Sequence, residues 1–369
     1  MKLITNKMNN DYDKLMNSFL NKNILEFSNL INNGYDANSL SDDGKSFISK
    51  MLEYPSDNTN KEFLNILLNS GMSLKQHGIE RGLLSISIRN QSKIDYLQKL
   101  LECNINVNTF GVYKGRLDDM SWPDCPPIFH AIAKGDIQFI DLLLKYDIDF
   151  DIENSEGETP LNYLIGAYCT YHRKPELLPS ICKKFLNHGA NPNAIGEMRR
   201  QSIHVLSLYY HNDDLFEILY KHNNEIDINA KDVYGDTALK ICASVGNFNG
   251  LKFLINHGAG LNIINRYKTS ALMMSVHSNS FEIFEYLLSH GESVLGCNND
   301  NNNILHFLAE NITIYEKSKF EKYYNEISKS NPELLVIKNK KGHTPLNILR
   351  NEGDYFSRLL YYPYITTNL

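Results

Sequence analysis

The chain has 369 residues, of which 42% are hydrophobic and 22% are charged, and its formal net charge is −6. This balance is ordinary for a folded protein, gives no basic footprint for nucleic acid or anionic lipid, and includes no apolar run near the roughly 18 residues of a membrane-spanning helix. The six cysteines form no Cys-x-x-Cys pair, and a chain of this length needs no disulfide staples, so reduced thiols in the cytoplasm are expected.

One apolar position recurs along the chain at intervals of 33 residues or more. Leu239, Leu272 and Leu305 are 33 residues apart, as are Ile128 and Leu161. With insertions allowed, the series reads Leu15, Ile48, Leu84, Ile128, Leu161, Ile203, Leu239, Leu272, Leu305 and Leu346. A chain longer than most single cores, with such a period, predicts an array of stacked repeats.

Each copy predicts two short antiparallel helices followed by a hairpin-like loop. In the clearest copy, Thr237 caps the first helix, Leu239 and Cys242 lie on one apolar face, and Gly246 ends the helix in a left-handed conformation. A leucine-rich second helix follows and is closed in several copies by glycine, at Gly34, Gly71, Gly189, Gly258 and Gly291.

The ends of the chain differ from the middle, as capping repeats do. Residues 1–40 are polar and predict an N-terminal capping repeat. Residues 41–350 predict the repeats, and residues 351–369 predict a C-terminal cap and tail.

Three insertions interrupt the repeats, near 109–125, 166–179 and 312–330. The first holds the one tryptophan, Trp122, with Tyr113, Asp118 and Asp119. Tryptophan and tyrosine are frequent anchors of interfaces, which favours partner binding. The alternative is that Trp122 packs the long loop onto its neighbouring unit.

The other two insertions favour structural roles over a catalytic or metal site. Cys169 and His172 stand three residues apart in the second, but zinc normally needs four ligands and no second pair follows. Glu316–Ser330 in the third predicts an amphipathic helix, because its apolar residues recur at helical spacing. These residues are Phe320, Tyr323, Tyr324 and Ile327.

The copies resemble the ankyrin-repeat family over roughly residues 12 to 360. The matching motifs include Thr159-Pro160-Leu161, Thr344-Pro345-Leu346 and the helix end Phe185-Leu186-Asn187-His188-Gly189-Ala190. Composition and divergent repeats also resemble ankyrin proteins of intracellular bacteria and large DNA viruses. The resemblance implies an all-α solenoid of about nine to ten stacked helix-turn-helix units with β-hairpin-like finger loops.

In this family, partners lie across the fingertips and first helices on the concave face. Carried onto this chain, the binding positions besides those of the first insertion are Glu197, Met198, Arg200, Tyr209, Val233, Tyr234, Asp236, Arg266, Tyr267 and His277. Further exposed positions are expected at Lys231, Ser244, Val245, Ile264, Thr269, Ser278 and Leu208. The alternative is that Tyr209, Tyr234 and Tyr267 pack on one another.

The resemblance also implies structural roles for several polar residues. His204 and His306 are expected to hydrogen-bond loop backbone. Asn193, Asn229 and Asn262 are expected to brace the hairpins, at a position that some family members hydroxylate.

The function implied is a cytoplasmic, monomeric scaffold that binds a protein, with a host-cell protein as one reading. No nucleic acid, membrane insertion, cofactor or metal is expected, and no catalytic motif for metal, nucleophile or nucleotide is present. Two alternatives stay open, an adaptor for a ubiquitin ligase and an enzyme built on the inserts. The enzyme alternative predicts that Cys125, Cys169 or His172 gather in a pocket.

Overall fold

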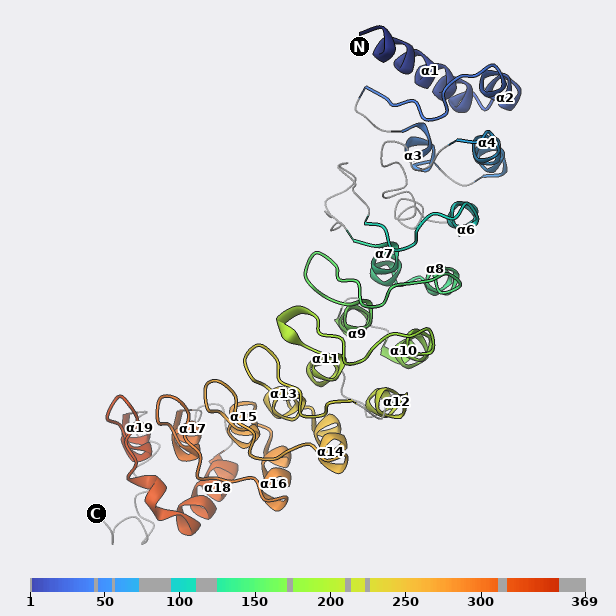
Figure 1. Cartoon of the computed structure of the whole chain (residues 1–369). Helices are drawn as coiled ribbons and strands as arrows, with labels where there is room; N and C mark the ends of the chain where they lie inside the picture. Colours follow the sequence, from blue (N-terminus) through green and yellow to red (C-terminus); the bar gives the residue numbers. More distant parts are fainter. Residues whose placement is uncertain are drawn as a thin grey trace. The chain divides into compact units, whose positions relative to one another are not determined.

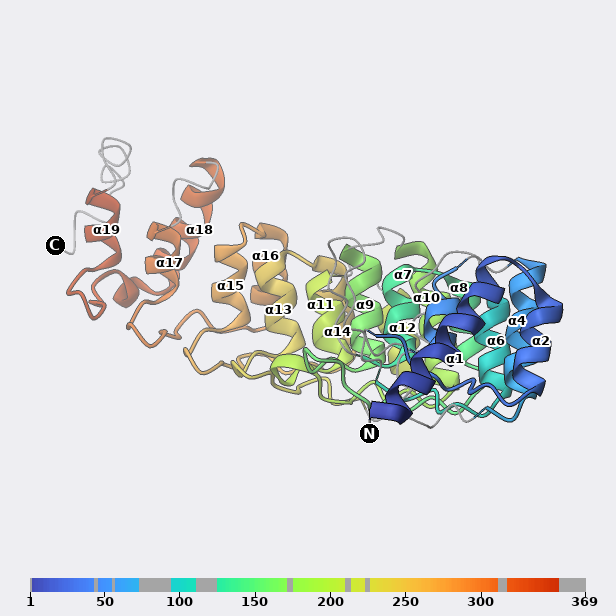
Figure 2. The ribbon, with the colours of Figure 1, turned by 90° about the horizontal axis from the view of Figure 1, so that it is seen from above.

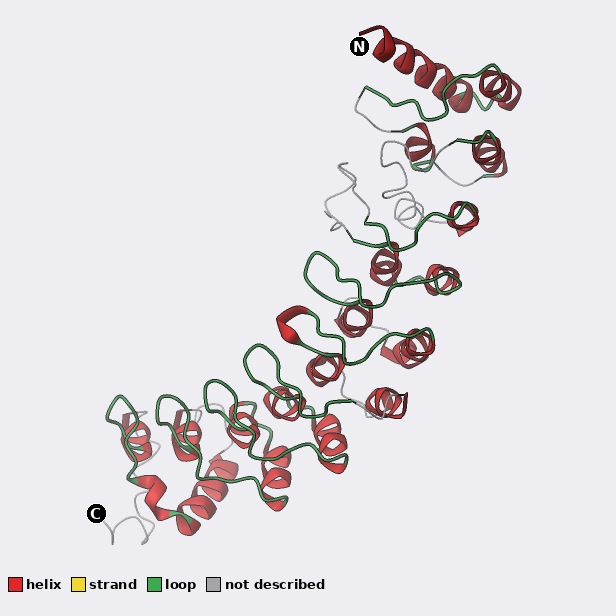
Figure 3. Cartoon of the chain, viewed as in Figure 1, coloured by secondary structure: helices red, strands yellow, loops and turns green. Residues whose placement is uncertain are grey.

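The computed structural model describes residues 2–42, 46–54, 57–72, 94–110, 125–170, 175–209, 214–222, 226–310 and 317–351 (Figure 1). Within these ranges the chain is built of helices and loops, and the only β contacts are two isolated bridges, Leu40–Ser46 and Cys297–Asn303 (Figure 3). The predicted all-α class is therefore confirmed. None of the described helices is both long enough and apolar enough to cross a bilayer.

The chain divides into two compact units, of which unit 1 comprises residues 1–168 with 187–190. The helix pairs α1 with α2 and α7 with α8 pack together, and α6 packs on α8. Its helices are α1 (Lys2–Leu20), α2 (Ile24–Asn32), α3 (Phe47–Met51), α4 (Asn58–Asn69), α6 (Ile94–Glu102), α7 (Pro127–Lys134), α8 (Ile137–Leu143) and most of α9 (Pro160–Thr170).

Unit 2 comprises residues 169–186 and 191–369. Its α-helices are α10 (Leu178–Asn187), α11 (Ser202–Tyr209), α12 (Asp214–His222), α13 (Ala238–Val245), α14 (Phe248–Asn256), α15 (Ala271–His277), α16 (Phe281–Ser289), α17 (Ile304–Glu310), α18 (Lys317–Ser330) and α19 (Pro345–Asn351). Its 3-10 turns are η2 (Pro175–Leu177), η3 (Glu197–Arg199) and η4 (Pro332–Leu335).

The helices of unit 2 form two rows (Figure 1), and their loops gather along one side (Figure 2). The first helices α11, α13, α15, α17 and α19 contact one another in that order. Each of α12, α14, α16 and α18 packs beside the first helix that precedes it, and α14 also contacts α16. This arrangement buries one face of every short helix against its neighbours, which no single repeat could do alone.

The recurring apolar position lies in the core wherever it is described, with one partial exception. Leu346 is half-buried, and Leu84 lies outside the described residues. The other eight are at most 5% exposed, namely Leu15, Ile48, Ile128, Leu161, Ile203, Leu239, Leu272 and Leu305. The period read from the sequence therefore identifies the side chains that stack the repeats.

The predicted helix ends are confirmed at α13. Thr237 Oγ1 accepts a hydrogen bond from the Lys240 backbone N–H at 3.4 Å, and Gly246 adopts φ 77° at the C-terminus. That left-handed φ is strained for residues with a Cβ, which explains glycine there.

The three insertions are described to different extents. The helix predicted in the third is present as α18, where Tyr323, Tyr324 and Ile327 are buried. Residues 111–124 lie outside the described residues, and so do Tyr113, Asp118, Asp119 and Trp122. Residues 171–174, which include His172, lie outside them as well. The boundaries 1–40, 41–350 and 351–369 stay predictions.

A buried carboxylate follows α16 where other repeats have alanine. Glu292 is 4% exposed and occupies the position that Ala190 and Ala259 fill elsewhere. Its Oε2 accepts a hydrogen bond from the Asn262 backbone N–H at 3.0 Å. Burial raises the pKa of Glu292, and the backbone N–H groups of Asn262, Leu272 and Ala271 offset part of that rise.

This raised pKa gives the protein a pH-dependent stability. The folded state holds the Glu292 proton more tightly than the unfolded state, so this group's contribution is fully present below the unfolded pKa and is lost as pH rises through the folded pKa. We expect Glu292→Ala to gain stability relative to the native chain as pH rises from about 4 to 8. Urea unfolding across that range measures the difference, and a constant difference would contradict the expectation.

Candidate functional site

Five six-residue loops of unit 2 share one register and one closing hydrogen bond. These loops, called the finger loops below, are residues 195–200, 231–236, 264–269, 297–302 and 338–343. In each, the second residue donates its backbone N–H to the carbonyl oxygen of the sixth. The distance is 2.8 Å from Gly196 to Arg200 and 3.0 Å from Asp232 to Asp236. The loops therefore have the hairpin shape predicted for them, without a strand ladder inside each loop.

An aspartate or asparagine braces four of the five finger loops. Asp232 Oδ1 accepts hydrogen bonds from the backbone N–H groups of Tyr234 at 2.8 Å and Asp236 at 2.9 Å. The second residues of the next three loops, Asn265, Asn298 and Asn339, make the same pair of bonds. This use of a side chain as a turn acceptor accounts for part of the chain's 45 asparagines.

The brace also explains one wrong prediction. Thr269 was expected at the surface but is only 9% exposed. Its hydroxyl donates to Asn265 Oδ1 at 2.9 Å, and its backbone N–H donates to the same oxygen at 3.0 Å. Thr269 is therefore part of the loop's internal scaffold and not of its outer surface.

The first finger loop has glycine in place of the bracing residue and is built differently. Met198 and Arg199 both have left-handed backbone, with φ 54° and 57°. Arg200 reaches the next loop, where its Nε lies 3.5 Å from Asp232 Oδ2. A contact between loops thus supports the one loop that lacks an internal brace.

Successive finger loops are joined by a backbone ladder with one hydrogen bond per step. In every step, the third residue of one loop donates its N–H to the carbonyl oxygen of the fourth residue of the loop before. The four bonds run from Val233 to Met198 at 2.8 Å, from Arg266 to Tyr234 at 3.0 Å, from Asn299 to Tyr267 at 2.9 Å, and from Lys340 to Asp300 at 2.8 Å. The tips are therefore held in a fixed register relative to one another.

This ladder presents large apolar and aromatic side chains to solvent. Met198 is 40% exposed, Tyr234 38% and Tyr267 54%, and each is the fourth residue of its loop. Tyr209, at the end of α11, is 44% exposed. Within the described part of the chain, no ring contact joins the three tyrosines, so nothing there supports the alternative that they pack on one another.

The other predicted binding residues are exposed to different degrees. Glu197, Arg266 and His277 are exposed, whereas Val233, Arg200 and Asp236 are half-buried. Asp236 Oδ1 lies 2.7 Å from Nζ of Lys240, an α13 residue whose side chain is 6% exposed. This buried lysine could not be foreseen, because the same position carries an uncharged residue in other copies, at Asn162, His204, Met273 and His306.

The predicted structural roles are found in unit 2 for both histidines and for Asn229 and Asn262, whereas the bracing role of Asn193 stays a prediction. His204 Nε2 lies 3.0 Å from the Ala230 carbonyl oxygen, and His306 Nε2 lies 3.1 Å from that of His343. Burial lowers the pKa of both rings, which favours their neutral form. Asn229 and Asn262 each accept a backbone N–H of the following repeat at 2.7 Å, as bracing residues should.

The described residues offer little for metal or nucleophilic chemistry. No group of three or more His, Cys, Asp and Glu side chains among them could hold a metal ion. One Cys–His contact in unit 1 was not predicted from the sequence: Cys125 Sγ lies 3.5 Å from His130 Nε2. Both residues are 3% exposed, so a substrate has no direct access to the sulfur.

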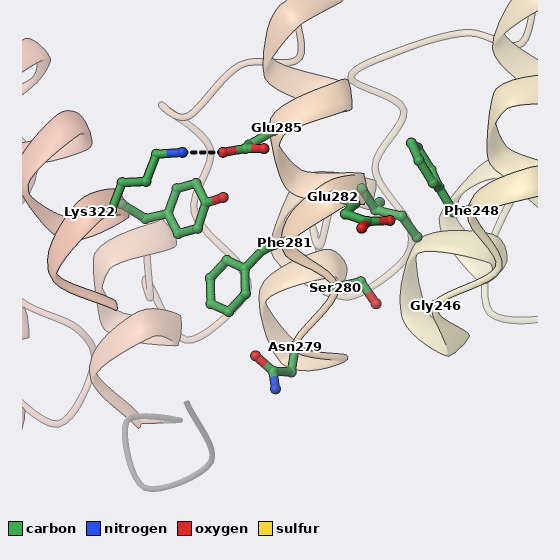
Figure 4. Close-up of a pocket in the computed structure, with 10 residues that line it drawn as sticks. Gly246, Phe248, Asn279, Ser280, Phe281, Glu282, Glu285 and Lys322 are labelled. Carbon is green, nitrogen blue, oxygen red and sulfur yellow. Dashed lines mark hydrogen bonds and ion pairs between the residues drawn. The ribbon is translucent and has the colours of Figure 1, made fainter. Parts of the chain in front are cut away.

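A groove of about 490 Å³ lies where α18 meets α16, and it extends to the start of α14 (Figure 4). Tyr323 of α18 stacks on Phe281 of α16 with ring centroids 4.6 Å apart and planes 3° apart. Lys322 forms an ion pair with Glu285 across the same boundary. Because these contacts attach the inserted helix to the repeat stack, we interpret the groove as a consequence of helix packing. It is the rival to the finger loops as a binding site.

Comparison with protein families and known proteins gives distant matches. A family model described as ankyrin repeats in three copies matches residues 168–265. Transient receptor potential cation channel subfamily A member 1 of Homo sapiens is 26% identical over 182 residues, which is 48% of this chain and 15% of the channel. The chain therefore matches only a small part of that relative.

Two viral relatives match over comparable lengths. A putative ankyrin repeat protein of Acanthamoeba polyphaga mimivirus is 25% identical over 202 residues, 53% of this chain and 25% of that protein. A putative ankyrin repeat protein of fowlpox virus (strain NVSL) is 26% identical over 160 residues, 43% of this chain and 92% of that protein. Among solved structures, the ankyrin repeat domain of Bcl-3 aligns with a TM-score of 0.47 and 20% identity, covering 63% of this chain and 95% of that domain.

Proposed function

Because the chain is an ankyrin-repeat protein, we propose that it is a scaffold that binds a partner protein on the finger loops and first helices of unit 2. The observation that carries this proposal is the ladder that aligns Met198, Tyr234 and Tyr267 at the loop tips. Interfaces draw their affinity from a few aromatic or large apolar anchors, and side chains held in register lose little entropy on binding.

The surroundings of these anchors also suit a protein partner. Exposed polar residues such as Glu197, Arg266 and His277 flank them, as the polar rim flanks the centre of an interface. The six free cysteines support a cytoplasmic location. The viral relatives support a host-cell protein as the partner. No feature of the described residues favours the ubiquitin-adaptor or the enzyme alternative.

The proposal is tested by affinity capture from eukaryotic cell lysate with the full chain. We expect partners retained by the native chain to be lost from a variant that combines Met198→Ala, Tyr234→Ala and Tyr267→Ala. Each anchor truncated at an interface centre costs about 1–4 kcal/mol, so three together weaken binding by at least a hundredfold.

A matched control removes three exposed apolar side chains that no finger loop carries. Leu20, Leu25 and Val336 are 51%, 74% and 62% exposed, and their combined alanine variant should capture the same partners as the native chain. Circular dichroism should first show equal helicity in all three proteins. Equal capture by the finger variant and the native chain would reject the finger surface.

A further inference from the structure

The finger loops of unit 2 are basic, although the whole chain is acidic. The five loops contain eight lysine or arginine residues and four carboxylates, a formal charge of +4 in a chain of net charge −6. The cations are Arg199, Arg200, Lys231, Arg266, Lys268, Lys338, Lys340 and Lys341. The finger loops therefore carry both the exposed tyrosines Tyr234 and Tyr267 and these eight cationic side chains.

The carboxylates of these loops are mostly engaged within the protein. Asp232 is 3% exposed and accepts two backbone N–H groups, and Asp236 pairs with Lys240. Only Glu197 and Asp300 remain as exposed acidic side chains on the loops. Among the eight loop cations, the ion pair with Asp232 therefore engages Arg200, whose Nε lies 3.5 Å from Asp232 Oδ2.

The cations, by contrast, are open to a partner. Apart from Arg200, which contacts Asp232, all of them are exposed. Arg199, Lys231, Arg266, Lys268, Lys338, Lys340 and Lys341 form no ion pair with any described residue. These seven charges lie along one aligned edge and create a positive potential there, which Glu310 offsets in part near Lys341.

The conformation of a finger loop does not require basic residues. The unit 1 loop in the same register, residues 153–158, carries Glu153, Glu156 and Glu158 and no cation. It uses the same brace, since Asn154 Oδ1 accepts the N–H groups of Glu156 and Glu158 at 2.9 Å. The fold therefore tolerates either sign of charge, and the basic edge of unit 2 needs another explanation.

We propose that the basic finger edge of unit 2 binds an extended, acidic segment of the partner protein. This inference rests on the proposed function and adds the charge of the partner to it. Arg266, Lys268 and Lys340 pair with carboxylates of the segment, while Tyr234 and Tyr267 hold its apolar side chains. Opposite charges across an interface steer association and select among partners.

A nucleic acid suits the edge less well. Glu197 and Asp300 stand beside Met198 and Tyr267 in the ladder, where they would face a continuous row of phosphates. The overall charge of −6 also repels a long polyanion. A short acidic segment avoids both costs because its carboxylates can be spaced to miss these two residues.

The test selects ligands from random twelve-residue peptides displayed on phage, with the full chain as the immobilised target. We expect the enriched peptides to be rich in Asp and Glu. A fluorescent copy of one such peptide should bind about tenfold more weakly to the variant Arg266→Glu, Lys268→Glu, Lys340→Glu than to the native chain, and weaken further as salt is raised.

The matched control reverses three exposed lysines that lie off the finger loops. The variant Lys145→Glu, Lys183→Glu, Lys329→Glu has the same net charge as the finger variant and should bind the peptide within about twofold of the native chain. Equal weakening by both variants would overturn the proposal, because overall charge and not the edge would then set affinity.

Three other outcomes also decide the question. Enriched peptides that are neutral or basic, and still need Tyr234 and Tyr267, would overturn the acidic segment while leaving the proposed function intact. If a labelled single-stranded oligonucleotide bound more tightly than the peptide, the proposal would be overturned and nucleic acid would be the ligand of the basic edge. No enrichment at all would overturn the inference, and failure of the native chain to capture any partner from lysate would overturn the proposed function with it.

Discussion

Replacing Leu239 by alanine is expected to lower the free energy of unfolding by about 2–5 kcal/mol. Leu239 is 2% exposed on α13, which contacts α11, α14 and α15, so the substitution leaves a cavity in the core of the stack. Urea unfolding followed by circular dichroism measures the change. Because repeats are stabilised mainly by their neighbours, hydrogen exchange should accelerate in α11 and α15 as well as in α13.

The control for this prediction is a leucine outside the core. Leu295 is 57% exposed, and Leu295→Ala should change the free energy of unfolding by no more than about 0.5 kcal/mol. A similar loss in both variants would contradict the identification of the 33-residue period with the core.

Replacing Asn265 by alanine is expected to cost about 2–3 kcal/mol, because the accepting oxygen Oδ1 is lost with the side-chain amide. Asn265 Oδ1 accepts the N–H groups of Tyr267 and Thr269 and the hydroxyl of Thr269, at 2.9, 3.0 and 2.9 Å. Thr269 is 9% exposed, so water cannot replace these bonds freely. The finger loop should lose its shape, and amide exchange of Tyr267 and Thr269 should rise.

The chain itself supplies the control for this second prediction. Asp232 makes the same two backbone bonds in the preceding finger loop, so Asn265→Asp keeps the acceptor and should cost less than about 1 kcal/mol. If aspartate at position 265 destabilises the protein as much as alanine does, the bracing oxygen is not the cause.

Much of the fold could be predicted from local patterns in the sequence. The period of Leu239, Leu272 and Leu305 predicted buried residues because each repeat presents the same face to its neighbours. Thr237 and Gly246 predicted the ends of α13 because their chemistry acts within one turn of the helix. The amphipathic spacing of Tyr323 and Ile327 predicted α18 for the same local reason.

The features that depend on contacts within a loop, or between a loop and its neighbours, could not be predicted in this way. Thr269 is buried because of a bond to Asn265 that its own type does not reveal. The pairing of Lys240 with Asp236, four residues earlier, depends on how the end of the loop meets the start of α13. The ladder joins residues about 33 positions apart in sequence through backbone atoms, which carry no sequence signal.

The basic edge was missed for a related reason. A whole-chain charge of −6 argues against a basic footprint, and the cations of the finger loops are spread over almost 150 residues of sequence. They meet on one edge only after the loops are aligned by the ladder. Charge should therefore be counted per aligned loop in a repeat protein, since the stack gathers residues that the chain separates.

The central claim is that partners contact unit 2 at the finger ladder, and site-specific photo-crosslinking tests it most directly. The photoreactive residue p-benzoylphenylalanine would replace Tyr234, Tyr267 or, as the rival site, Glu282 in the groove between α16 and α18. We predict crosslinks to a partner protein from positions 234 and 267 and none from position 282. Crosslinks from position 282 with none from the two finger positions would contradict the account.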